Sequence, residues 1–234
     1  MKRLLYKILS SAVVLSVSVL LGCGTSESIP SLPAETPTCR PTPPAKGLCI
    51  VIDAGHGNPD GGAEGVTGAV EAGLNLSVAN MLKDELTAMG HSVTMTRSDE
   101  NALADTKRAD MSARRDIMNA PGVDMVISVH MNKFTDSSVC GPMVFYMEGS
   151  AEGERLAKTI IDSLCEALER PKRLANPGDY FVIRESIPVA VIVECGFLSN
   201  QNDEKLLTTE AHQRLLAKAI SAGIADYINQ KSEK

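Results

Sequence analysis

The chain has 234 residues, of which 44% are hydrophobic and 22% are charged, a composition that allows one domain with a sizeable buried core. Its net charge of −6 argues against a polyanionic partner, and with 3% aromatic residues and no Trp it has few rings on which bases could stack. We therefore expect a single folded domain that does not bind nucleic acid.

Residues 1–23 have the pattern of an export signal. A basic start with Lys2, Arg3 and Lys7 precedes a mainly apolar run over residues 8–21. Because this run is shorter than the roughly 20 residues of a transmembrane helix, we expect a cleaved signal peptide. An uncleaved anchor is the alternative.

The end of this segment, Leu20-Leu21-Gly22-Cys23, resembles the bacterial lipoprotein processing box. The resemblance implies that Cys23 receives lipid and becomes the first residue of the mature chain. The protein would then be an exported lipoprotein, held on the outer face of a membrane through its N-terminal lipid anchor. A plain secretory signal with an incidental cysteine is the alternative.

Residues 24–46 are interpreted as a proline-rich linker, because half of the chain's 12 prolines lie in this stretch. Helices and central strands do not tolerate prolines at such spacing. The linker is therefore expected to be an extended spacer, followed by the folded domain over residues 47–232.

The cysteines outside the lipoprotein box do not form a CxxC pair, which excludes a zinc ribbon. Cys49, Cys165 and Cys195 lie in apolar segments and are expected to be small buried side chains. A disulfide between Cys39 and Cys140 stays open.

The first predicted element of the domain is a buried strand. Residues 48–53 form a continuous apolar run that ends in the Gly-rich loop of residues 54–68. This loop carries His56. Asp53, just before the loop, is expected either to orient a ligand imidazole by a hydrogen bond or to cap the loop.

An amphipathic helix is predicted after the loop, because apolar residues recur at helical spacing from Leu74 to Leu86. Gly90 is a natural C-terminal cap for this helix. Glu71 should therefore lie in its first turn.

The remaining elements alternate between strand and helix. Strands are predicted over residues 92–96, 123–129, 141–147 and 189–193, and helices over residues 105–119, 152–168 and around 215–228. His130 follows one buried strand and Glu194 ends another. The alternation predicts an α/β fold: a single domain whose central sheet is mixed but mostly parallel, with helices on both faces.

Two histidines and two glutamates stand where apolar elements meet polar loops: His56, Glu71, His130 and Glu194. In such sheets ligands collect at the carboxyl ends of the strands, so these side chains should converge. Two imidazoles and one carboxylate can hold three of the four positions around Zn²⁺, and a second carboxylate can move protons. Taken singly, the histidines have simpler roles as turn or strand-end residues, and Glu71 as a helix-dipole partner.

Four segments that contain these residues resemble one family, the zinc-dependent N-acetylmuramoyl-L-alanine amidases (amidase type 3). The segments are Val51–Gly57, Val70–Leu76, Ile127–Asn132 and Ile192–Asn200. They occur in the family's order and span nearly the whole domain, so the resemblance is specific.

The resemblance implies a peptidoglycan hydrolase that cuts the amide between the lactyl group of N-acetylmuramic acid and the first L-Ala of the stem peptide. Carried over by position, His56, Glu71 and His130 would bind zinc and Glu194 would be the catalytic carboxylate. The chain has Glu71-Ala72-Gly73 where the family commonly has Glu-Lys-Asp, so the helix start is expected to be looser.

Further features refine this interpretation. Arg114 resembles a recurrent family arginine, and a surface or structural ion pair is its simpler role. The connection from His130 to Gly141 is too short for the inserted helix that blocks the site in some relatives, which predicts an open site. Residues 175–185 resemble the corresponding segment of the family branch whose members remove stem peptides during spore-cortex maturation.

Two other functions remain as alternatives. One is a different zinc peptidase that trims stem peptides, and the other is a catalytically silent wall-binding module.

Overall fold

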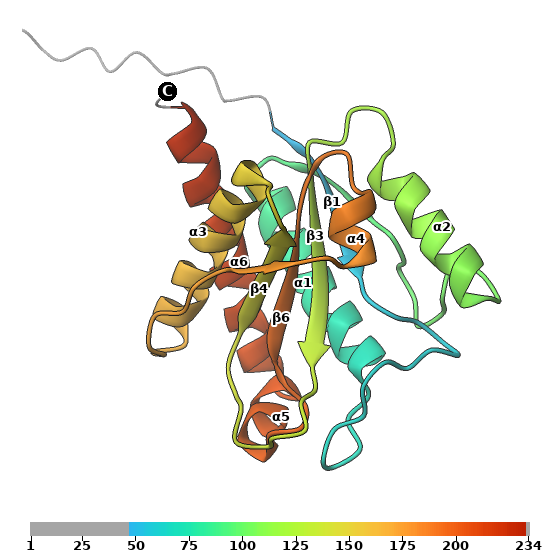
Figure 1. The fold of residues 1–234 in the computed structure, drawn as a ribbon, viewed down its shortest axis with the longest axis vertical. Helices are drawn as coiled ribbons and strands as arrows, with labels where there is room; N and C mark the ends of the chain where they lie inside the picture. Colours follow the sequence, from blue (N-terminus) through green and yellow to red (C-terminus); the bar gives the residue numbers. More distant parts are fainter. Residues whose placement is uncertain (1–46, 233–234) are drawn as a thin grey trace, which may run out of the picture. The chain divides into compact units, whose positions relative to one another are not determined.

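The computed structural model describes residues 47–232, which form six strands and six helices in a mostly alternating order (Figure 1). The strands are β1 (Cys49–Ala54), β2 (Ser92–Met95), β3 (Met125–Asn132), β4 (Met143–Met147), β5 (Asn176–Gly178) and β6 (Val189–Phe197). The helices are α1 (Glu71–Ala88), α2 (Lys107–Met118), α3 (Ala151–Ala167), α4 (Phe181–Glu185), α5 (Gln201–Leu207) and α6 (Glu210–Ser232). The predicted export signal, the lipid site at Cys23 and the linker lie outside the described residues.

The strands form one sheet in the order β2-β1-β3-β6-β4-β5. Strands β2, β1, β3 and β6 run parallel, β4 is antiparallel to β6, and β5 is parallel to β4. This confirms the predicted mixed, mostly parallel sheet. The carboxyl ends of β1, β3 and β6 therefore meet at one edge, which is where ligands bind in sheets of this kind.

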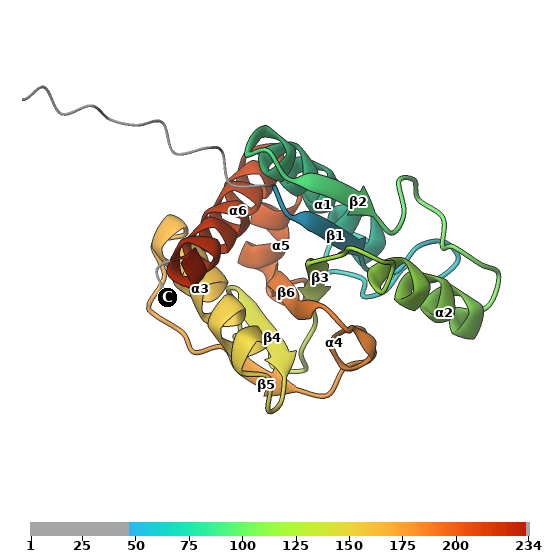
Figure 2. The ribbon, with the colours of Figure 1, turned by 90° about the horizontal axis from the view of Figure 1, so that it is seen from above.

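Alternating side chains of the strands enter two separate cores. Ile50 and Ile52 of β1 pack in the larger core, with buried residues of α1, α3 and α6. Val51 of β1 and Val126 of β3 face the opposite way and pack against α2 and α4. Figure 2 shows α1 and α6 on one side of the sheet and α2 and α4 on the other. Helices thus cover both faces, as predicted.

Helix α1 begins at Glu71, as expected, although no side chain caps it. The loop before it supplies the missing hydrogen bonds: the amide of Glu71 donates to the carbonyl of Ala63, and that of Ala72 to Gly61. The helix start is therefore tied to the Gly-rich loop and is not loose, despite the departure from the family pattern. At the other end, Gly90 takes a positive φ of 89°, which confirms its capping role.

Three short elements were not predicted: β5, α4 and α5. β5 has three residues, Asn-Pro-Gly, and is a strand only because it pairs with β4. α4 has five residues and α5 seven, both too short to show a helical period. Strands β3 and β6 are also longer than predicted, because their polar residues His130, Asn132 and Glu194 continue the strands toward the site.

The burial of the cysteines was predicted correctly at two of three positions. Cys165 and Cys195 are buried, but Cys49 is exposed. Cys49 is the first residue of β1, and burial of that strand begins only at the next residue. Cys140 is partly exposed beside the guanidinium of Arg170. Its proposed partner Cys39 lies outside the described residues, so that disulfide stays untested.

The connection between β3 and β4 contains no helix, as predicted from its length. Within residues 47–232, no helix is both long and apolar enough to span a bilayer.

Candidate metal centre

The structure brings His56, Glu71 and His130 together although they come from a loop, a helix start and a strand. Each offers one ligand atom, and these atoms all lie within 4.8 Å of one another. The loop after β1 carries His56, α1 begins with Glu71, and His130 is on β3. The convergence follows from the parallel pairing of β1 with β3 and from the ties between the loop and α1.

Two of the distances between donor atoms are close to those in a tetrahedral metal site. Glu71 places one oxygen 2.9 Å from Nδ1 of His130 and the other 3.3 Å from Nε2 of His56. Two atoms bound to one zinc at about 2.0–2.1 Å lie roughly 3.3 Å apart in a tetrahedron. Two imidazole nitrogens and one carboxylate oxygen are also ligands that Zn²⁺ accepts, with a fourth position left open. The residues therefore fit zinc.

The charges in this cluster are coupled. Burial raises the pKa of Glu71, but the two imidazoles outweigh burial and hold it well below its usual value. Burial lowers the pKa of His130, but contact with Glu71 and the charge of Glu194 raise it above its usual value. Burial also lowers the pKa of His56, and Glu71 again reverses the shift. A cation bound here would replace protons held by the imidazoles.

Asp60 holds the second nitrogen of His56, a role that the sequence did not indicate. Its Oδ2 lies 3.1 Å from Nδ1 of His56 and 3.1 Å from Nζ of Lys107. Burial raises the pKa of Asp60, but these contacts and a backbone amide outweigh burial and set it at about 2. An ionised Asp60 fixes the tautomer that leaves Nε2 of His56 free to bind a metal. The four-residue spacing from His56 was the only available signal.

Asp53 has neither of the roles predicted for it. Its carboxylate contacts Thr96, Ser128 and Arg114 and makes no bond to an imidazole. The reason is direction: Asp53 points from β1 toward α2, where it forms a 2.8 Å ion pair with Arg114.

Arg114 is 2% exposed, so the prediction of a structural ion pair is correct and that of a surface pair is wrong. Besides Asp53 it pairs with Asp110 at 2.9 Å. Its remaining donors bind the carbonyls of Ala54 and His56, so the buried ion pairs support the loop that carries the ligand.

Glu194 lies on β6 as the register partner of His130. One of its oxygens is buried and, among the described residues, has no hydrogen-bond partner. Burial raises the pKa of Glu194 to about 7, and the charge of Glu71 adds to this effect while the imidazoles oppose it. The predicted upward shift is therefore confirmed, and this carboxyl can change its protonation near neutral pH.

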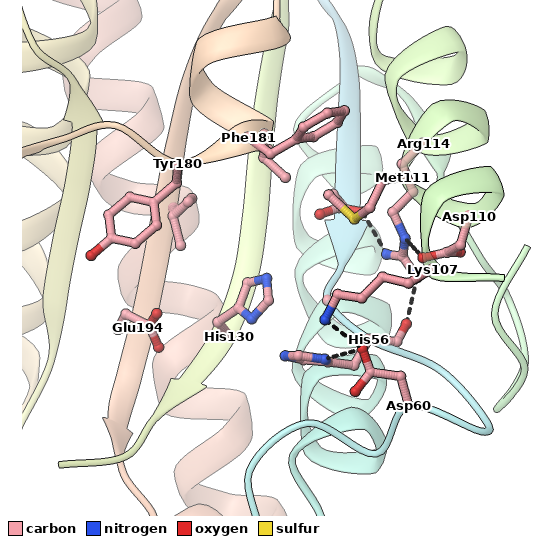
Figure 3. A pocket seen from close by; sticks show the side chains of 14 residues that line it. His56, Asp60, Lys107, Asp110, Met111, Arg114, His130, Tyr180, Phe181 and Glu194 are labelled. Carbon is pink, nitrogen blue, oxygen red and sulfur yellow. Dashed lines mark hydrogen bonds and ion pairs between the residues drawn. The ribbon is translucent and has the colours of Figure 1, made fainter. Parts of the chain in front are cut away.

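The cluster opens into a pocket of about 270 Å³. Figure 3 shows His130 and Glu194 on the strands, with His56, Asp60 and Lys107 facing them. Part of the lining is apolar and is formed by Met111 of α2, Tyr180, and Phe181 and Val182 of α4. The other two histidines do not take part: His91 accepts a hydrogen bond from Leu48, and His212 lines a different pocket.

An open pocket at the carboxyl edge of a parallel sheet, with three candidate metal ligands and a carboxyl that has one unpaired oxygen, is typical of a hydrolase that activates water. The chain belongs to the N-acetylmuramoyl-L-alanine amidase family, whose model matches residues 50–226. The recognition of this family from the sequence is confirmed. The protein is thus an amidase that acts on peptidoglycan.

Individual relatives agree with this assignment. The chain is 34% identical over 200 residues to the germination-specific N-acetylmuramoyl-L-alanine amidase of Bacillus subtilis, covering 81% of this chain and 84% of the relative. It superposes with a TM-score of 0.75 and 30% identity on the CwlD amidase of Clostridioides difficile, solved in complex with the GerS lipoprotein, over 78% of this chain and 98% of that one.

The fold also matches the catalytic domain of CwlV, an amidase of Bacillus (Paenibacillus) polymyxa, with a TM-score of 0.70 and 29% identity over 78% of this chain and 98% of that one. A probable cell wall amidase of Staphylococcus epidermidis is 30% identical over 80% of this chain and 60% of the relative. Relatives named for the cell wall indicate an exported enzyme.

Proposed function

We propose that the amidase depends on zinc, that His56, Glu71 and His130 bind the ion, and that Glu194 is the catalytic acid and base. The observation that carries this proposal is the convergence of the three ligand atoms within 4.8 Å, beside a carboxyl that has one buried oxygen without a hydrogen-bond partner among the described residues. The family assignment supports it, because zinc hydrolases keep one open position for water.

When bound, zinc lowers the pKa of a coordinated water toward about 7 and polarises the scissile carbonyl. Glu194 takes a proton from the attacking water and delivers it to the departing nitrogen. Burial of Glu194 raises the pKa of its carboxyl, which moves the group toward the range in which it can both accept and donate a proton. The apolar wall around Phe181 shields one side of the pocket from bulk water.

The bond cut is the amide between the lactyl group of N-acetylmuramic acid and L-Ala of the stem peptide. Water adds to the carbonyl carbon, the C–N bond breaks, and the products are a free lactyl carboxylate and a stem peptide with a free amine. A role in the spore cortex, where stripped muramic acid becomes a lactam, is supported by the germination-specific relative and by the resemblance of residues 175–185.

A digest of purified peptidoglycan, read by mass spectrometry, tests this function. The amidase should release whole stem peptides that begin with L-Ala, and a chelator should abolish release until zinc is added back. Release of single terminal residues would instead show a peptidase. Full release by the Glu194→Ala variant would refute the assignment of the catalytic carboxyl.

We also propose that the protein is a lipoprotein anchored at Cys23 and facing the cell wall. The Clostridioides difficile relative was solved with a separate lipoprotein bound, whereas this chain carries a candidate lipid site of its own. Labelled fatty acid should be incorporated into the parent chain and not into the Cys23→Ser variant. Equal labelling of the parent and the Cys23→Ser variant would refute this proposal.

A further inference from the structure

Arg97 follows β2 and is 3% exposed, yet among the described residues its guanidinium makes no hydrogen bond to the side chains of the candidate metal ligands. All the hydrogen bonds that it makes in the described part of the chain go to backbone carbonyls. Nε donates to Ala54 at 2.9 Å and Nη1 to Asp99 at 2.7 Å, while Nη2 donates to Gly55 at 3.0 Å and to Ala72 at 2.7 Å.

The two carbonyls that share Nη2 flank two zinc-ligand candidates. Gly55 directly precedes His56, and Ala72 directly follows Glu71. A single nitrogen of Arg97 therefore joins the loop that carries one ligand to the first turn of the helix that carries the other.

Asn75 makes a second tie between the same two segments. Its Nδ2 donates to the carbonyl of Gly55 at 3.1 Å and to Oε1 of Glu71 at 3.2 Å. Asn75 is fully buried, so both bonds form away from water. Two buried side chains thus hold the same carbonyl next to His56.

The loop needs such support because His56 has a φ of 62°, in the left-handed region that non-glycine residues rarely adopt. A residue stays there only when its surroundings fix it from several sides. Arg97 and Asn75 hold the carbonyl before His56, and Arg114 holds the carbonyl of His56 itself.

A buried guanidinium that contacts only carbonyls is costly to desolvate, so a simple packing role would be served better by an apolar side chain. The planar fork of arginine can reach three backbone segments at once, whereas lysine offers one point of contact. We therefore infer that arginine is needed at this position because it donates several hydrogen bonds in fixed directions.

We propose that Arg97, together with Asn75, presets the separation of His56 and Glu71 before the metal binds. Both are positioning residues. The inference rests on the proposed zinc function and deepens it. A site that is already formed binds its ion more tightly, because no free energy is lost in ordering the loop.

The test is zinc affinity, measured on the full chain by competition with a chelator. Arg97→Lys and Arg97→Met should each weaken zinc binding by roughly 10–100-fold, the range seen when groups that orient metal ligands are removed. Arg170→Lys is the matched control, since this partly buried arginine pairs with Asp203 in a different pocket. Its zinc affinity should equal that of the parent.

A double-mutant cycle separates positioning from general destabilisation. In a His56→Ala background, the hydrogen bonds of Arg97 no longer position an imidazole. Adding Arg97→Lys should therefore weaken zinc binding much less in that background than in the parent. An equal loss in both backgrounds would overturn the proposal.

The outcomes also separate this inference from the proposed function. A parent that does not bind zinc refutes the function, whereas a parent that binds zinc while folded Arg97 variants bind it equally well refutes only the inference. If neither Arg97 variant folds, Asn75→Ala takes over the test, and unchanged zinc affinity in that variant overturns the proposal.

Discussion

His130 of β3 and Glu194 of β6 are register partners on adjacent parallel strands, and both side chains face the pocket (Figure 3). A candidate zinc ligand and the candidate proton carrier therefore lie side by side on two hydrogen-bonded central strands of the sheet. Sites built on strands hold their geometry better than sites built on loops. His56, in contrast, depends on a loop that buried arginines must support.

Replacing Glu194 by Gln should stop catalysis without removing the metal. We expect kcat to fall about 10²–10⁴-fold, because the proton carrier is lost while size and shape are kept. Zinc affinity should stay within a few-fold of the parent, and the thermal midpoint should not fall, since an amide is easier to bury than a carboxylate. Glu148→Gln, at an exposed position, is the control. Substantial remaining activity would show that another group moves the proton.

Asp60→Asn should weaken zinc binding roughly 10–100-fold, because the ionised partner of His56 Nδ1 is lost. Lys107→Met removes the other side chain bonded to Asp60 and should have a smaller effect, since that lysine is exposed. Chelator competition on both variants measures the difference. Equal zinc affinity of the parent and Asp60→Asn would mean that Asp60 does not orient the imidazole.

Gly55→Ala should displace the imidazole of His130. A Cβ at this position would lie 2.1 Å from Cε1 of that ring, far inside contact distance. Because a shift of about 1 Å at a reacting centre can cost about 10²-fold, we expect a loss of at least this size in kcat/KM. The control is Gly73→Ala, where the new Cβ meets open space and alanine favours the helix. Parent-like kcat/KM in Gly55→Ala would show that the ring of His130 does not pack against Gly55.

Asp53→Asn should lower stability in a pH-dependent way. Burial raises the pKa of Asp53, but Arg114 and two hydroxyl groups outweigh burial and lower it from 3.8. The stabilisation is therefore fully present above this value and is lost as pH falls through the lower, folded-state pKa. Removing one partner of a buried ion pair costs about 3–5 kcal/mol.

Urea unfolding at about pH 7 should show the full loss in the free energy of unfolding of Asp53→Asn relative to the parent. The difference between the two proteins should become smaller only below about pH 4. Asp116→Asn, at an exposed ion pair, should change stability little at any pH. A difference for Asp53→Asn that stays constant down to the lowest pH would show that its charge is not the cause.

The strands and long helices could be predicted because their cause is local. β1 is a continuous apolar run, since both of its faces are buried, and α1 repeats its apolar residues with a helical period. The same reasoning placed strand ends too early at His130 and Glu194, because a polar side chain that faces a pocket looks like the start of a loop. Cys49 was predicted to be buried but is exposed, because an apolar run in the sequence does not show at which residue burial begins.

The sequence by itself determined the family, and it singled out the four candidate residues His56, Glu71, His130 and Glu194, because water activation demands particular side chains within short, recognisable segments. Only the tertiary structure decided what holds them. Arg97 reaches carbonyls 25 to 43 positions away in the chain, and Arg114 supports a loop about 60 positions away. Every residue has the same backbone carbonyl group. A hydrogen bond to that group therefore does not depend on which residue type supplies it, and the sequence does not reveal the contact.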